Sequence, residues 1–142
     1  MKPLYNVFIT HAWRYHADWT KAGELLEADR DVTWRNFSVP WYDPAFDPNT
    51  PLGKTHLHAW LESQIQPVDV VLLLAGVYGV KSSRKWLDLE LEMARGQGKP
   101  VFVLPPIGRE EVAPDVAALG DAVVLWHAES IRVALDGRRK AA

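Results

Sequence analysis

The sequence predicts an α/β fold, a single three-layer domain with a central five-stranded parallel sheet and helices on both faces. Apolar, β-rich runs alternate with helical patterns along the whole chain, which is typical of such a sheet. The run from Val68 to Ala75 is almost uninterruptedly apolar, as a central parallel strand must be. The 142 residues suffice for one domain with a substantial core and are too few for two.

The first half of the chain predicts two strands, a helix between them and a long loop. Tyr5–Thr10 has the pattern of a strand, and Asp18 can cap a helix whose apolar residues repeat at helical spacing up to Leu26. Thr33–Ser38 is a second, shorter strand. Val39–Gly53 contains four prolines and shows no period, so we expect a long ordered loop there, and such loops are often functional.

The second half predicts three strands and three helices. Gly96 and Gly98 should stop the second of these helices. In chain order the elements are a helix over Lys54–Gln64, the strand Val68–Ala75, a connection over Gly76–Lys85, a helix over Trp86–Arg95, a strand over Pro100–Leu104, a strand over Ala122–Trp126, and a last helix that contains Ser130–Leu135.

Composition excludes several classes of protein. The formal net charge of −2 gives no basic field for nucleic acid, and the one basic cluster, Arg138 to Lys140, is assigned to a C-terminal tail over 138–142 that follows a domain over 1–137. No cysteine is present, which excludes disulfides, thiolate zinc sites and cysteine nucleophiles. No apolar run is long enough to span a bilayer. We therefore expect a soluble, cytoplasmic protein that binds neither nucleic acid nor membranes.

Glu90 occupies an unusual position in its predicted helix. Each residue of a helix advances by about 100°, so Trp86 and Ala94 lie on the apolar arc one turn to either side of Glu90. The other charged residues of this segment fall on the opposite face. An unpaired carboxylate buried there would cost several kcal/mol. Glu90 therefore either has a charged partner or borders a cavity, and the second option indicates a site.

The rim of the sheet is the predicted place for a ligand. In open α/β sheets, ligands bind beyond the carboxyl ends of the strands, where the connections to the helices converge. Three connections lie at that rim. They are Thr10–Trp13, the proline-rich loop after Ser38, and Gly76–Ser83, which leads to Trp86 and Glu90.

Familiar ligand motifs are missing from this rim. A dinucleotide site of the Rossmann type needs a Gly-x-Gly-x-x-Gly turn where this chain has Thr10–Trp13, and no Walker loop is present. A phospho-acceptor domain needs acidic residues after the first strand, and Thr10 and His11 are not acidic. His56 and His58 are two apart on a helix and point in different directions, so we expect no metal site.

Several segments together resemble the TIR-like family of small bacterial α/β domains, in the branch found in Thoeris anti-phage systems. Thr10 stands where the family's opening Phe-Ile-Ser-His motif has a serine, which keeps the hydroxyl. The segments that carry the resemblance are Tyr5–Trp13, Asn36–Pro40, Asp69–Tyr78, Ser83 with Trp86-x-x-x-Glu90, and Gly98–Pro100. The resemblance covers nearly the whole chain and implies a flavodoxin-like, TIR-like fold.

The resemblance also implies an activity, namely cleavage of the nicotinamide–ribose bond of NAD with Glu90 as the catalytic glutamate. NAD is then the substrate, and no cofactor or metal is expected. A cyclic ADP-ribose-type product would signal to a separate effector protein, and the family implies self-association through TIR-like surfaces. The implied substrate-binding residues are Thr10, His11, Ala12, Trp13, Asp43, Ser83 and Trp86.

Simpler roles remain open for these residues. Glu90 can pair with Arg84 or Lys85, Trp86 can belong to the core, and Ser83 can cap a helix. His11 can position the loop, and Asp43 can serve a turn. At the level of function, the alternatives to an enzyme are a non-catalytic interaction module and a nucleotide binder without chemistry.

Overall fold

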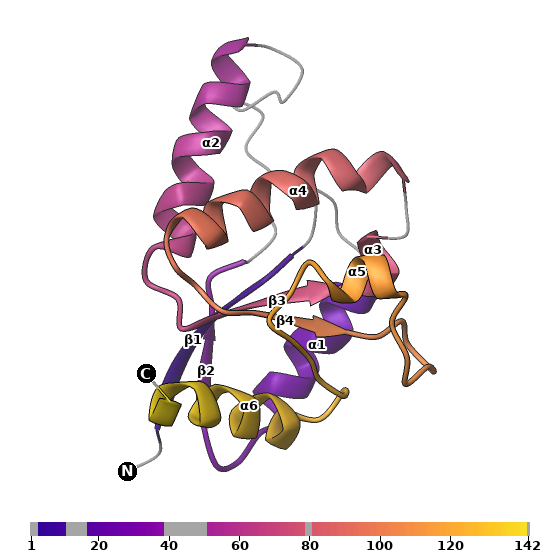
Figure 1. Cartoon of the computed structure of the whole chain (residues 1–142). Helices are drawn as coiled ribbons and strands as arrows, with labels where there is room; N and C mark the ends of the chain where they lie inside the picture. The colour runs from indigo at the N-terminus through magenta and orange to yellow at the C-terminus, as the bar shows by residue number, and fades with distance from the viewer. Residues whose placement is uncertain (1–2, 11–16, 39–50, 79–80, 142) are drawn as a thin grey trace.

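The protein folds into a sheet with helices on both sides (Figure 1), and the computed structural model describes residues 3–10, 17–38, 51–78 and 81–141. The sheet has five strands, all parallel, in the order β2-β1-β3-β4-β5. The strands are β1 (Leu4–Ile9), β2 (Thr33–Asn36), β3 (Val70–Leu74), β4 (Val101–Leu104) and β5 (Ala122–Val123). The helices are α1 (Ala17–Glu27), α2 (Pro51–Ile65), α3 (Ala75–Tyr78), α4 (Lys81–Gly96), α5 (Pro114–Ala117) and α6 (Ala128–Ala141). The predicted α/β class and five-stranded parallel sheet are confirmed.

The apolar strands divide the core into two layers, one on each face of the sheet. Side chains alternate between the faces of a strand, so Val7 and Ile9 contribute to one layer and Phe8 to the other. All five residues of β3 are buried, because this central strand is covered on both faces. The near-continuous apolar run of Val68–Ala75 reflects this double burial.

Each face is covered by its own helices (Figure 1). On one face, α1 and α6 bury Trp19, Leu26 and Ile131 against the sheet. On the other face, α2 and α4 bury Leu61 and Leu91, and α5 adds its own buried apolar residue.

The strand order places a topological switch point between β1 and β3. The chain moves outward from β1 to β2 on one side and from β3 to β4 and β5 on the other. In sheets of this kind, the crevice beyond the carboxyl ends of the two strands at the switch point is the usual ligand site. The connections that leave β1 and β3 are therefore the ones that matter for function.

Some boundaries differ from the sequence-based predictions. The connection Gly76–Lys85 was predicted to be irregular, but it contains the short helix α3, and α4 already begins at Lys81. Ser83 therefore lies inside the first turn of α4 and not before the helix. The helix α6 continues through Ala141, so it includes most of the segment 138–142 that was predicted as a tail. The predicted end of α4 is confirmed, with Gly98 at φ 69° just after the helix.

A polar cluster fixes α6 to the amino-terminal edge of the sheet. The Asp29 carboxylate accepts a hydrogen bond from Trp34 Nε1 at 2.9 Å and lies 3.2 Å from Arg132 Nε of α6. Tyr5 donates from its hydroxyl to Asp136 of the same helix at 2.6 Å. This cluster stabilises the edge opposite to the carboxyl rim, so it belongs to the scaffold and not to the candidate site.

Candidate active site

Three buried polar side chains mark the candidate site and its support. Among the described residues, Thr10, Ser38 and Glu90 are the polar or charged residues that are essentially inaccessible, with exposures of 0%, 0% and 1%. Thr10 and Ser38 follow the carboxyl ends of β1 and β2, and Glu90 lies on α4, the helix that follows β3 and α3. Buried polar groups are costly unless they have a structural or functional role, so each of the three requires an explanation.

Thr10 joins the two strands of the switch point. Its main-chain N–H donates to the carbonyl of Leu72 at 3.0 Å, and its hydroxyl accepts the N–H of Leu74 at 3.2 Å. The second bond replaces a main-chain bond of the parallel ladder, because the chain leaves the sheet at Thr10. The hydroxyl oxygen is thus used by the fold, and the hydroxyl proton is the group that Thr10 can offer to a ligand.

Ser38 has the corresponding role between β2 and β1. Its hydroxyl accepts the N–H of Ile9 at 3.0 Å and the indole N–H of Trp19 at 3.2 Å. The same hydroxyl donates to the side-chain oxygen of Asn36, which also accepts the Ser38 N–H at 2.8 Å. One hydroxyl therefore connects β1, β2 and α1 at the carboxyl rim.

Glu90 is buried as its position in the helix predicted. Its neighbours along the apolar face of α4, Leu87, Leu91 and Ala94, are 0%, 2% and 0% exposed. Thr10 and Glu90 are thus two buried polar groups in the connections that leave the switch-point strands, Thr10 directly after β1 and Glu90 on the helix that follows β3 and α3.

The start of α4 is held by a small polar cluster. Tyr78 donates from its hydroxyl to Asp88 at 2.9 Å, and Arg84 Nε donates to the carbonyl of Tyr78 at 3.1 Å. The guanidinium of Arg84 also lies 5.1 Å from the centre of the Tyr78 ring. Burial and the nearby Asp88 carboxylate raise the pKa of Tyr78, despite the Arg84 charge. Arg84, one suggested partner of Glu90, is exposed and makes these contacts with Tyr78.

Several predicted site residues cannot be placed. His11, Ala12, Trp13 and Asp43 lie outside the described residues. Ser83 and Trp86 belong to the helix α4 by their main chain, and their side chains are outside the described part of the structure. The structure shows that Thr10 and Glu90 are buried, and the roles of all the predicted site residues, these two included, stay predictions.

Sequence reasoning missed the network around Ser38. Ser38 was predicted as the last residue of a strand and as part of the segment Asn36–Pro40 that carries the family resemblance, with no hydrogen-bonding role. The available signal was the Asn36-x-Ser38 pair at the strand end, since an Asn side chain readily accepts the N–H two residues later and turns the chain. The third partner, Trp19, could not be found in this way, because its indole N–H contacts Ser38 across the fold.

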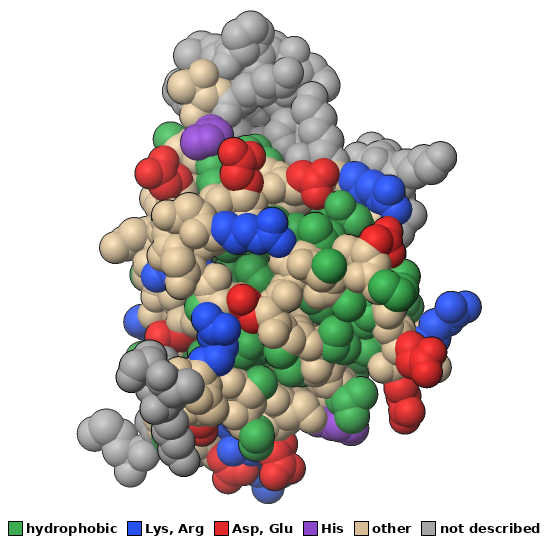
Figure 2. All heavy atoms as spheres, in the orientation of Figure 1, with side chains coloured by type: hydrophobic (Ala, Val, Ile, Leu, Met, Phe, Trp, Pro, Cys, Tyr) green, Lys and Arg blue, Asp and Glu red, His purple; other side chains and the backbone are tan. Residues whose placement is uncertain are grey.

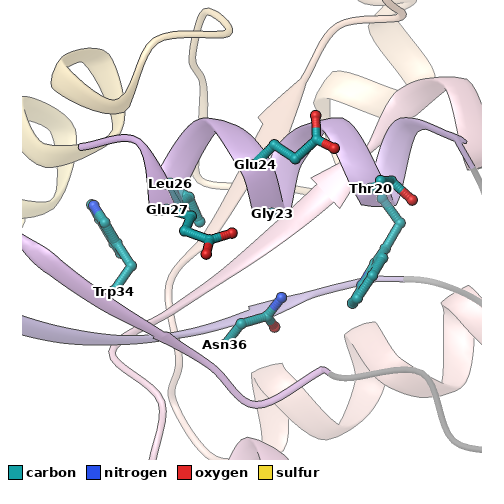
Figure 3. Close-up of a pocket in the computed structure, with 8 residues that line it drawn as sticks. Thr20, Gly23, Glu24, Leu26, Glu27, Trp34 and Asn36 are labelled. Carbon is teal, nitrogen blue, oxygen red and sulfur yellow. The ribbon is translucent and has the colours of Figure 1, made fainter.

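A separate groove lies between α1 and β2 (Figure 3). It measures about 380 Å³, and in Figure 3 Asn36 and Trp34 of β2 face Gly23 and Glu27 of α1 across it. Trp19 and Asn36, which both contact Ser38, line this groove. The groove is thus adjacent to the Ser38 network, and Glu90 does not line it.

The described ranges contain neither a cluster of metal ligands nor a membrane-spanning helix. No group of three or more His, Cys, Asp or Glu side chains there could hold a metal ion. No helix in that part of the chain is both long enough and apolar enough to cross a membrane.

Comparison with known proteins identifies the family. Among curated proteins, no relative matches the chain. The model of the family described as Thoeris protein ThsB, TIR-like domain, matches residues 8–111, which include Thr10, Ser38 and Glu90. This match covers more than half of the 142 residues and agrees with the five-stranded parallel sheet. The chain therefore belongs to the family of ThsB-type TIR-like domains of Thoeris.

Proposed function

We propose that the protein cleaves the nicotinamide–ribose bond of NAD, with Glu90 as the catalytic carboxylate. The observation that carries this proposal is the burial of Glu90, 1% exposed, on the helix that leaves the switch-point strand β3. A carboxylate in such surroundings interacts strongly with positive charge, because little water screens it. Membership of a Thoeris TIR-like family supports the same activity.

The reaction requires a negatively charged carboxylate and does not require a proton donor. Nicotinamide leaves NAD with the electron pair of the broken bond and becomes a neutral base, so no proton has to be donated to it. The positive charge passes to the ribose, which takes on oxocarbenium character. Glu90 stabilises this charge, and a Thr10 hydroxyl that can donate its proton suits an oxygen of the ribose or phosphate.

The product depends on which oxygen attacks the ribose. Water would attack the anomeric carbon and lose a proton, which gives ADP-ribose. A hydroxyl of the same molecule would close a ring and lose its proton, which gives a cyclic ADP-ribose-type product. We propose the cyclic product, used as a signal for a separate effector, because the chain belongs to a Thoeris family.

Self-association is part of the proposal. Val123 and Leu125 at the β5 edge and Val133 on α6 are 44%, 43% and 64% exposed. They line a groove of about 510 Å³ between these two elements. Figure 2 shows apolar side chains at the surface between α4 and α6. An exposed apolar surface beside a short edge strand suits contact with a second copy of the chain.

The decisive experiment compares nicotinamide release by the wild type, Glu90→Gln and Glu92→Gln. Glu92 is an exposed carboxylate two residues further along α4, so its variant is a matched control. We expect Glu90→Gln to lose at least about a hundredfold in turnover, because the buried charge is removed while the shape stays. Glu92→Gln should match the wild type. Equal turnover by all three proteins would refute the role of Glu90.

A second outcome concerns the alternative function. A wild type that releases no nicotinamide, even with candidate activators added, would favour the non-catalytic interaction module, for which the exposed apolar surface is the specific observation. Calorimetry with NAD would separate a silent binder from a protein that does not bind NAD. Mass spectrometry of the product would distinguish the linear from the cyclic form.

A further inference from the structure

The buried hydroxyl of Ser38 lies just after the end of β2 and accepts a hydrogen bond from the neighbouring strand β1. Phe37 donates its N–H to the carbonyl of Val7, so the ladder between β1 and β2 is intact up to that point. The next donor on β1, Ile9, would find a carbonyl of β2 if the ladder continued. It finds Ser38 Oγ instead, at 3.0 Å. The serine thus replaces a main-chain acceptor at the point where the chain leaves β2.

The same hydroxyl is saturated by partners from three elements. It accepts from Ile9 and from the indole of Trp19 on α1, and it donates to Asn36. The Asn36 atom that contacts the Ser38 N–H must be the oxygen, because a main-chain N–H only donates. Ser38 is fully inaccessible, so water cannot take over any of these bonds. The direction of each hydrogen bond is therefore fixed.

The network extends across the rim to the candidate site. Ile9, held by Ser38, is followed directly by Thr10, whose hydroxyl accepts the N–H of Leu74. Two hydroxyls in a row therefore replace the last main-chain acceptors at the carboxyl ends of β2 and β1. The lateral position of Thr10 relative to β3 depends on both. No hydrogen bond or ion pair within the described residues joins Ser38 to Glu90 directly, so any influence of Ser38 on the site passes through Ile9 and Thr10.

We propose that Ser38, acting with Asn36, is a positioning residue for substrate binding, an inference that rests on the proposed NAD-cleaving function. Ser38 sets the place of Thr10 at the switch point without touching the substrate itself. Its loss therefore weakens substrate binding more than it slows bond cleavage at Glu90.

The test uses Ser38→Ala, with Ser63→Ala as matched control. Ser63 is exposed on α2 and donates to the Trp60 carbonyl of its own helix, so the same chemical change there should be neutral. For Ser38→Ala we expect the KM for NAD to rise about tenfold while kcat stays within about twofold. A purely structural role would instead lower the fraction of active protein, which reduces the apparent kcat and leaves KM unchanged. That result would overturn the proposal.

If Ser38→Ala does not fold, two Asn36 variants test the positioning role. Asn36→Asp keeps an oxygen acceptor for the Ser38 N–H and hydroxyl, whereas Asn36→Leu has a similar shape and no acceptor. We expect Asn36→Leu to raise KM as Ser38→Ala does and Asn36→Asp to restore it. Equal KM values for both variants would overturn the positioning role.

A binding measurement separates this inference from the proposed function. In the Glu90→Gln background NAD stays intact, so calorimetry gives its dissociation constant directly. Adding Ser38→Ala to that background should weaken NAD binding about tenfold. Binding that is unchanged by Ser38→Ala overturns the positioning role and leaves the proposed function standing. A wild type that neither binds nor cleaves NAD overturns the proposed function, and the positioning role with it.

Discussion

The hydroxyl of Thr10 accepts a hydrogen bond from the main-chain N–H of Leu74, with 3.2 Å between Thr10 Oγ1 and Leu74 N. This bond joins β1 to β3 at the switch point of the sheet, where the main-chain ladder between them has already ended. A serine at this place would offer the same oxygen. The position thus supplies an acceptor for the sheet and keeps a hydroxyl proton to donate.

The first prediction concerns the stability of this junction. Thr10→Val keeps the shape of the side chain but leaves the buried N–H of Leu74 without its acceptor, so the free energy of unfolding should fall by about 1–3 kcal/mol. Thr10→Ser keeps the oxygen and should lose less than half as much. Urea unfolding of the three proteins checks this. If both variants were equally stable, the hydroxyl would contribute nothing to the sheet.

The second prediction contrasts two glycines. A Cβ atom on Gly120 would lie 2.6 Å from a methyl of Val103 and 2.9 Å from the carbonyl oxygen of Val101. Gly120→Ala should therefore destabilise the protein by about 1–3 kcal/mol, since the main chain of β4 would have to move. Gly137 lies on the exposed side of α6 with no atom within 4 Å of the corresponding position.

Gly137→Ala is the matched control for that contrast. Alanine favours the helical state over glycine, so this variant should be more stable than the wild type by about 0.5–1 kcal/mol. Thermal unfolding of Gly120→Ala and Gly137→Ala tests the expected loss and the expected gain of stability in one experiment. A gain in stability at Gly120 would show that the approach to Val101 is not a constraint.

The third prediction concerns self-association. Val133 on α6 is 64% exposed and lines the same groove at the β5 edge as Leu125. Val133→Glu places a charge in this apolar surface and should shift the protein towards the monomer, as measured by light scattering over a range of concentrations. Gln66→Glu, which adds the same charge on an exposed turn after α2, is the control. A wild type that stays monomeric at all concentrations would contradict the proposed contact.

Much of the fold follows from patterns that are local in the sequence. The long apolar run of β3 predicts that this strand is buried on both faces of the sheet. The position of Glu90 within the apolar arc of α4 predicts that its side chain is buried. The start of α4 could not be predicted in the same way. Its first turn is held by the contact of Arg84 with the carbonyl of Tyr78, and this contact depends on α3, which has only four residues. Such a short helix leaves no periodic pattern.

The residues of the candidate site also differ in whether a local sequence pattern could identify them. Glu90 is recognisable because its charge conflicts with the period of its own helix. Ser38 agrees with the end of an ordinary strand, and its importance comes from partners 29 and 19 residues away, Ile9 and Trp19. A side chain that satisfies donors from other elements has no local signature. The sequence therefore reveals a charged residue that interrupts an apolar helical pattern. It does not reveal a polar residue whose hydrogen-bond partners come from distant elements.

The last prediction is a pH dependence of stability that originates at Asp29. Burial alone would raise the pKa of this carboxyl, but hydrogen bonds from the Trp34 indole and the Asp31 N–H, together with the Arg132 charge, lower it below its ordinary value of 3.8. The folded state thus releases the proton more readily than the unfolded state. The resulting stability is fully present above the unfolded pKa and is lost as the pH falls through the folded pKa.

Asp29→Asn tests this assignment because it removes the titrating group and keeps the shape of the side chain. The variant should be less stable than the wild type at neutral pH, and the difference between the two proteins should shrink as the pH is lowered through the acidic range below about pH 4. Asp115→Asn in the first turn of the short helix α5 serves as control, since that carboxylate is exposed and far from Arg132. Denaturant unfolding between pH 3 and pH 7 gives the three curves. Parallel curves for the wild type and Asp29→Asn would mean that Asp29 does not link proton binding to folding, and that Arg132 holds α6 to the sheet without help from this charge.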